Sequence, residues 1–162
     1  MSETPSPEEV AAWQRRLASQ ANNRAWSLSE SLSRSPEEDE EMLQAAHAAM
    51  YFWKMVGNAS NRAHAAQLVA HAYALLKLPN PAKHYLRQSQ PFFQAQDSNP
   101  WELALSHAVA ANVAAVAGEG DAHARHFAEA KRMVSELADP EDREILGATM
   151  RVVSTPSTKG VA

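Results

Sequence analysis

Histidine is the residue type through which this sequence could do chemistry, because the chain has seven His and no Cys. A neutral imidazole can bind a metal ion, and its pKa lies close enough to neutral pH for proton transfer. Glu119, His123 and His126 follow one another at i, i+4 and i+7, so neighbouring pairs on a helix could reach one ion. However, the Glu-x-x-His motif of carboxylate metal bundles occurs nowhere in the chain. We therefore expect a solvated helix face here and assign no metal ligands.

A second pair of histidines lies on a helix predicted over residues 60–78. His64 and His71 are two helical turns apart, about 10.5 Å along the axis, which is too far to share one ion. With Leu68 and Leu75 they form a stripe about 100° round the helix from a stripe of alanines. Two interpretations stay open: the imidazoles are satisfied between packed helices, or one stripe contacts a peptide or ligand.

The helix predicted over residues 36–56 is apolar nearly all round. Its expected core stripe is Met42, Ala46, Ala49, Trp53 and Val56. His47, Tyr51 and Met55 lie opposite, either against a second neighbour or as an aromatic and polar binding surface. These patterns lead to the hypothesis that one cleft is lined by His47, Tyr51, His64 and His71.

Catalytic motifs are absent from the sequence. There is no G-x-S-x-G, no phosphate-loop lysine motif, no H-E-x-x-H and no glycine-rich dinucleotide turn. Ser106 and His107 are adjacent on a predicted helix and so do not face each other as nucleophile and base. Without Cys, thiol catalysis and disulfides are excluded. The sequence favours a non-catalytic protein without a cofactor and leaves an enzyme as the weaker alternative.

The elements that must position these residues are helices, and a recurring phrase marks where they begin. Ser, Asn or Asp precedes Pro in SPEEV, SPEED, NPAKH, NPWEL and DPEDR. The first residue is a good N-cap, Pro is tolerated at the first helical position, and acids suit the positive end of the helix dipole. No stretch shows strand alternation. We predict an all-α protein of seven helices over 7–32, 36–56, 60–78, 81–96, 100–117, 121–138 and 140–153.

Composition limits the class of protein. The 162 residues fit one domain over 6–153, and we expect the ends, 1–5 and 154–162, to be disordered. A net charge of −4 gives no reason to expect nucleic acid as a partner. No apolar run approaches the roughly 20 residues of a membrane span, and the N-terminus is polar and acidic, so we expect a cytoplasmic protein. Protonation of all seven His would move the charge from −4 to +3, so we expect charge reversal in mild acid.

Two predicted helical hairpins within 60–138 share a pattern of small and large residues at an offset of 41. The matching positions are Ala70, Tyr73, Ala82, Leu86 and Ser89 in one hairpin, and Ala111, Ala114, Gly118, Phe127 and Ala130 in the next. This pattern resembles the tetratricopeptide-repeat (TPR) family, although the repeat is longer than the usual 34 residues and the Trp-Leu-Gly opening is missing. A closed helical bundle is the alternative, binding a small ligand or metal in a cavity lined by His, Tyr and Trp, with or without catalysis.

The resemblance implies a scaffold that binds a protein or peptide in a concave groove, lined by the first helix of each hairpin. The implied groove residues are His64, Gln67, His71 and Leu75, then Leu105, Ala108, Asn112 and Val116. Asn112 has no basic partner on these stripes, so we expect no clamp for a C-terminal carboxylate. The first two helices and the last would act as caps.

Trp26 lies on the opposite side of the first helix from Val10, Leu17, Leu28 and Leu32. An exposed Trp at this position would indicate a homodimer contact. The alternative is that the first helix packs on both sides.

Overall fold

The structure is a computed structural model that describes residues 4–95 and 99–158. Residues 1–3 and 159–162, at the ends that the sequence predicts to be disordered, lie outside the described residues, as do residues 96–98. The described part contains helices and no strand, which confirms the all-α prediction. The helices are α1 (Pro7–Ser29), α2 (Pro36–Val56), α3 (Ala59–Leu75), α4 (Pro79–Phe93), α5 (Pro100–Val116), α6 (Gly120–Glu136) and α7 (Pro140–Val152).

The Ser-Pro and Asx-Pro phrases begin helices as predicted in four places. Ser6 and Ser35 form reciprocal capping boxes, in which each Ser Oγ accepts from the backbone N–H of the Glu three residues later. That Glu carboxylate accepts from the Ser backbone N–H at 2.8 Å in both boxes. Asn99 and Asp139 cap α5 and α7 through their side-chain oxygens. Each cap satisfies a backbone donor that the helix itself leaves unpaired.

The predicted start of the fourth helix is wrong. Helix α4 begins at Pro79, two residues early, with Leu78 at the N-cap position and no side-chain cap, so Asn80 lies inside the first turn. Pro at the first helical position was the stronger signal, since its fixed φ suits a helix start. Pro91 neither kinks away nor splits the element, and α4 continues to Phe93. Asn58 caps α3 through a box with Asn61, a start that the sequence placed at Ser60.

Two helix ends are built alike at positions 41 residues apart. Lys77 and Gly118 have positive φ angles of 61° and 72° directly after α3 and α5. The N–H of Leu78 then reaches back to Tyr73 O, and that of Glu119 to Ala114 O, as in a Schellman motif. Lysine rarely adopts this conformation, which explains why α3 ends earlier than its sequence predicted.

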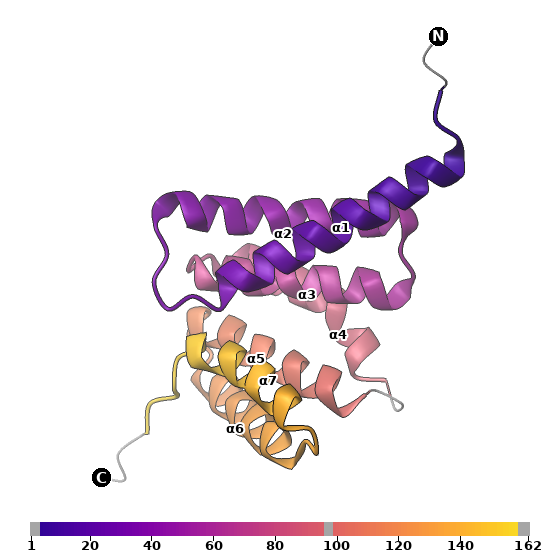
Figure 1. The fold of residues 1–162 in the computed structure, drawn as a ribbon. Coiled ribbons are helices and arrows are strands. Elements are labelled where there is room, and N and C mark those ends of the chain that lie inside the picture. Colours follow the sequence, from indigo (N-terminus) through magenta and orange to yellow (C-terminus); the bar gives the residue numbers. More distant parts are fainter. Residues whose placement is uncertain (1–3, 96–98, 159–162) are drawn as a thin grey trace.

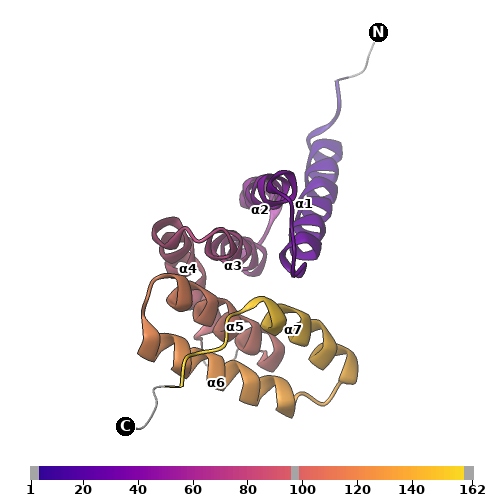
Figure 2. The same ribbon diagram turned by 90° about the vertical axis from the view of Figure 1, so that its left-hand side faces the viewer.

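Consecutive helices pack as pairs, namely α1 with α2, α3 with α4 and α5 with α6 (Figure 1). Helix α3 also contacts α1, α2 and α5, while α7 packs on α5 and α6. Figure 2 shows the pairs side by side, with α7 against the last pair. The resemblance to the TPR family stays a prediction.

The core consists of two clusters of small and branched side chains, one centred on α2 and α3 and the other on α3, α4, α5 and α7. Helices α3 and α5 are buried over most of their lengths, because alanines let neighbouring helices approach from several sides. Trp26, Tyr73 and Tyr85 contact both clusters. Met42, Ala46 and Ala49 form the buried stripe of α2 as predicted.

Candidate functional site

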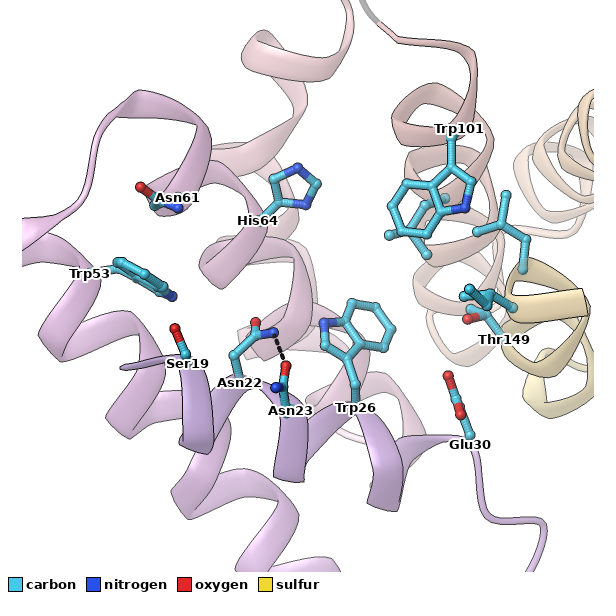
Figure 3. A pocket seen from close by; sticks show the side chains of 13 residues that line it. Ser19, Asn22, Asn23, Trp26, Glu30, Trp53, Asn61, His64, Trp101 and Thr149 are labelled. Carbon is cyan, nitrogen blue, oxygen red and sulfur yellow. Dashed lines mark hydrogen bonds between the residues drawn. The ribbon is translucent and has the colours of Figure 1, made fainter. Parts of the chain in front are cut away.

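A groove of about 470 Å³ runs between α1, α3, α5 and α7 and takes one side chain from α2 (Figure 3). We call it the Trp groove, because Trp26, Trp53 and Trp101 reach it from three helices. Its other lining residues are Ser19, Asn22, Asn23, Glu30, Asn61, His64, Leu105, Ile145, Leu146 and Thr149.

Local structure fixes the three indoles. Trp26 packs against both core clusters, and its ring centroid lies 5.6 Å from that of His71. Trp101 sits in the first turn of α5, where its N–H donates to the capping Asn99 side chain at 2.8 Å. Trp53 precedes the α2–α3 connection at Gly57, where an added Cβ would lie 2.6 Å from Trp53 O and 2.8 Å from Asn61 Cβ. Glycine is therefore needed there for the close approach that brings Trp53 and Asn61 to one wall.

The groove is polar but carries few charges. His64 donates from Nε2 to Glu102 Oε1 at 2.8 Å, which joins α3 to α5 at one wall. Burial raises the pKa of the Glu30 carboxyl, and the charge of Arg151 opposes this rise. No Lys or Arg is among the described residues that line the groove. An uncharged or basic ligand therefore fits this electrostatic environment better than an acidic one.

Figure 3 shows Trp26, Trp53 and His64 pointing toward a common space from α1, α2 and α3, with Asn22 between them. Indole surfaces supply apolar contact area, and amide side chains both donate and accept hydrogen bonds. This combination suits a chain that has apolar side chains and a polar backbone.

No family model, curated protein or solved structure matches this chain. The site must therefore be interpreted from its own geometry.

The residues that the TPR resemblance assigns to a groove divide between the Trp groove and the core. His64 and Leu105 line the Trp groove. Gln67, His71 and Asn112 are buried, as is Ala108, and none of them lines it. Leu75 and Val116 are half-buried and pack against the core clusters.

The hypothesis of one cleft formed by His47, Tyr51, His64 and His71 is wrong. His47 and Tyr51 line a separate pocket between α2, α3 and α4, while His64 lines the Trp groove. His71 has no exposed surface, because Trp26 packs over its ring. Each residue does lie off the main core stripe of its helix, but the stripes of α2 and α3 face different neighbours.

A buried polar cluster lies between α3 and α5, formed by Gln67, His71 and Asn112. Asn112 donates from Nδ2 to His71 Nδ1 at 3.1 Å, which leaves the ring proton on Nε2. That Nε2 and both amide atoms of Gln67 are buried without a hydrogen-bond partner among the described residues. Burial and the nearby charge of Arg34 lower the pKa of His71 to about 4, so its ring is neutral at pH 7.

Glu119, His123 and His126 do not converge. Glu119 forms an ion pair with Lys83, and His123 donates from Nε2 to Ser154 O at 2.6 Å. The Nδ1 atom of His126 lies 3.0 Å from that of His107 on α5. The described residues contain no group of three or more side chains that could hold a metal ion. The predicted solvated face is wrong for His123, which is buried.

Sequence reasoning missed most of the groove. Trp53 was placed in the core stripe of α2, yet it is only half-buried and lines the groove. Trp26, predicted as a dimer contact, is half-buried because α1 packs on both sides. Asn22, Asn23 and Thr149 carried no signal of their own, since only the packing of α1 near α7 brings them together.

None of the helices in the described ranges combines the length and the hydropathy needed to cross a membrane.

Proposed function

We propose that the protein is a non-catalytic binding module, and that the Trp groove holds an extended segment of a partner protein. The observation that carries the proposal is one groove lined by side chains from α1, α3, α5 and α7, the first helix of each pair and the last helix. Its three indoles and three Asn side chains, at 22, 23 and 61, supply apolar surface and backbone hydrogen bonding together. The TPR-like character of the helix pairs and a cytoplasmic location belong to the same proposal.

The partner segment is expected to be uncharged or basic, with aromatic or aliphatic side chains. The only charged carboxylate among the lining residues is Glu30, and Glu102 lies beside the groove on His64. An acidic segment would face these carboxylates without a Lys or Arg among the described lining residues to pair with. Apolar side chains would gain from contact with the indoles, because burial of apolar surface is the main favourable term in association.

The proposal is tested by a pull-down from lysate of the source cell, with crosslinking and mass spectrometry to map the bound segment. The groove variant carries Ser19→Arg and Ile145→Arg, two exposed positions on α1 and α7. The matched control carries Ala124→Arg and Ala128→Arg on exposed positions of α6 outside the groove. Both variants add the same charge and bulk, and circular dichroism checks that both fold.

The expected result is a partner held by wild type and control and lost by the groove variant, with crosslinks from an uncharged or basic segment to α1 and α7. A synthetic peptide of that segment should then bind wild type at least tenfold more tightly than the groove variant. A partner that the groove variant retains, or one crosslinked to another face, would overturn the proposal. His71 is unsuitable for such a test, because a charge at this buried position would unfold the protein.

A further inference from the structure

One long stretch of the chain has a charge opposite to that of the whole protein. Residues 42–96 contain no Asp or Glu, whereas the chain as a whole has 19 acids and a net charge of −4. The same stretch carries the basic residues Lys54, Arg62, Lys77, Lys83 and Arg87. It forms most of α2 and all of α3 and α4, so the positive potential is concentrated on one part of the fold.

A pocket of about 690 Å³ lies within this stretch, between α2, α3 and α4. We call it the anion pocket. It is lined by His47, Met50, Tyr51, Lys54, Arg62, Ala66, His84, Tyr85 and Gln88. Its volume falls in the range typical of small-molecule sites.

The two cations of the anion pocket have capacity to bind. Lys54 forms no ion pair or hydrogen bond with any of the residues described, and it is exposed. Arg62 donates from Nη1 to Gly57 O at 2.7 Å, which leaves other guanidinium donors for a ligand. A guanidinium and an ammonium without competing carboxylates match the geometry and charge of a phosphate group.

Aromatic rings form the other wall. Tyr85 stacks on Tyr73 with ring centroids 5.8 Å apart, and the rings of His47 and His84 meet it edge-on. The His47 Nε2 atom lies 2.9 Å from Tyr73 Oη, so this wall is held in place by a hydrogen bond as well as by packing. Tyr51 exposes 60% of its surface and offers a ring against which a planar group can stack.

We propose that the anion pocket binds a phosphorylated small molecule with a planar ring, of the size and chemistry of a nucleoside monophosphate. The phosphate lies between Lys54 and Arg62, and the ring lies against Tyr51 and the aromatic wall. This site is separate from the Trp groove and does not depend on the peptide proposal, since no residue lines both.

The test is isothermal titration calorimetry at low salt with the 5′-monophosphates of adenosine, guanosine, cytidine and uridine, beside the free nucleosides and inorganic phosphate. Lys54→Glu reverses the charge inside the pocket, and Lys77→Glu makes the same change in the same stretch but outside it. Tyr51→Ala removes the exposed ring. Melting temperatures without ligand check that the variants fold.

At least one monophosphate should bind more tightly than its nucleoside and than phosphate, and more weakly as salt rises. Lys54→Glu should weaken that binding at least tenfold, Tyr51→Ala at least threefold, and Lys77→Glu by less than twofold. Three results overturn the proposal: no monophosphate binds wild type at millimolar concentration, phosphate alone binds as tightly, or Lys54→Glu and Lys77→Glu behave alike.

Discussion

Gln67 is fully buried on α3, and neither of its amide atoms has a hydrogen-bond partner among the described residues. Burial of an amide without a partner costs about 1–3 kcal/mol, and an apolar residue of similar shape avoids that cost. Gln67→Met, which keeps the length of the side chain, should therefore raise the free energy of unfolding by about 1–2 kcal/mol. Urea denaturation followed by circular dichroism measures this change.

Gln44→Met is the control for this substitution, because Gln44 is exposed on α2. It should change the free energy of unfolding by less than about 0.5 kcal/mol. A clear loss of stability in Gln67→Met would contradict the expectation and would show that the amide does bind a buried partner.

The predictability of single residues follows from how local their cause is. Ser6, Ser35, Asn99 and Asp139 act on backbone groups two or three residues away, so their capping role can be predicted from neighbouring sequence. His71 could be placed on a stripe of α3, but its burial depends on Trp26, which lies 45 positions earlier in the chain. The same holds for Tyr51 and Trp53, whose separation depends on what packs on each side of α2.

At the scale of elements, the two Ser-capped helices begin in different surroundings. Helix α2 starts beside the end of α1, where Arg34 donates to Asp39 Oδ1 and to the carbonyl oxygens of Leu28 and Ser31. Helix α1 starts at an outer end of the molecule, and residues 6–9 are all exposed (Figure 1). The same capping box therefore stabilises a packed turn in one case and a free turn in the other.

Ser35→Ala should lower the free energy of unfolding by about 1 kcal/mol, because the cap is lost in a turn that unfolds with the whole domain. Ser6→Ala should lower it by less than half as much, since the first turn of α1 can fray without global unfolding. Urea denaturation of both variants gives the comparison. Equal losses would mean that the start of α1 unfolds cooperatively with the core.

The helices themselves were predictable because composition and caps act along the chain, and the errors have local reasons. Asn80 was taken as a cap, but Pro79 begins α4 first. Gly118 was predicted to end α5, whereas Lys77 was not predicted to end α3, because a lysine with positive φ carries no sequence signal. The candidate site was less predictable, since the Trp groove combines side chains from five helices and its form depends on their packing.

At the scale of the whole molecule, the two pockets divide the charge between them. The Trp groove has no Lys or Arg among its described lining residues, and the anion pocket has no carboxylate among its own. Helix α3 contributes to both, through Asn61 and His64 on one side and through Arg62 and Ala66 on the other. One buried helix thus separates a groove suited to an uncharged or basic chain from a pocket suited to an anion.

The expected reversal of charge in mild acid needs correction, because burial keeps several imidazoles neutral. Burial lowers the pKa values of His47, His71, His107 and His126, and that of His71 falls to about 4. Full protonation of seven His would give +3, which the folded protein therefore does not reach in mild acid. The unfolded chain, whose His titrate near pH 6.5, does take up these protons.

This difference in proton binding predicts acid sensitivity with a defined sign. Between pH 6.5 and about 4 the unfolded state holds a proton on residue 71 that the folded state lacks, so stability falls as pH is lowered. The slope from this one group is at most about 1.4 kcal/mol per pH unit. His71→Gln cannot titrate, so its stability should fall less steeply than that of wild type over this window. Urea denaturation at intervals from pH 7.5 to 4.5 gives both slopes, and NMR of wild type should show the His71 ring protons unchanged above pH 5. Equal slopes, or a His71 ring that titrates near pH 6.5 in the folded protein, would show that the ring reaches solvent and that Trp26 does not keep it covered.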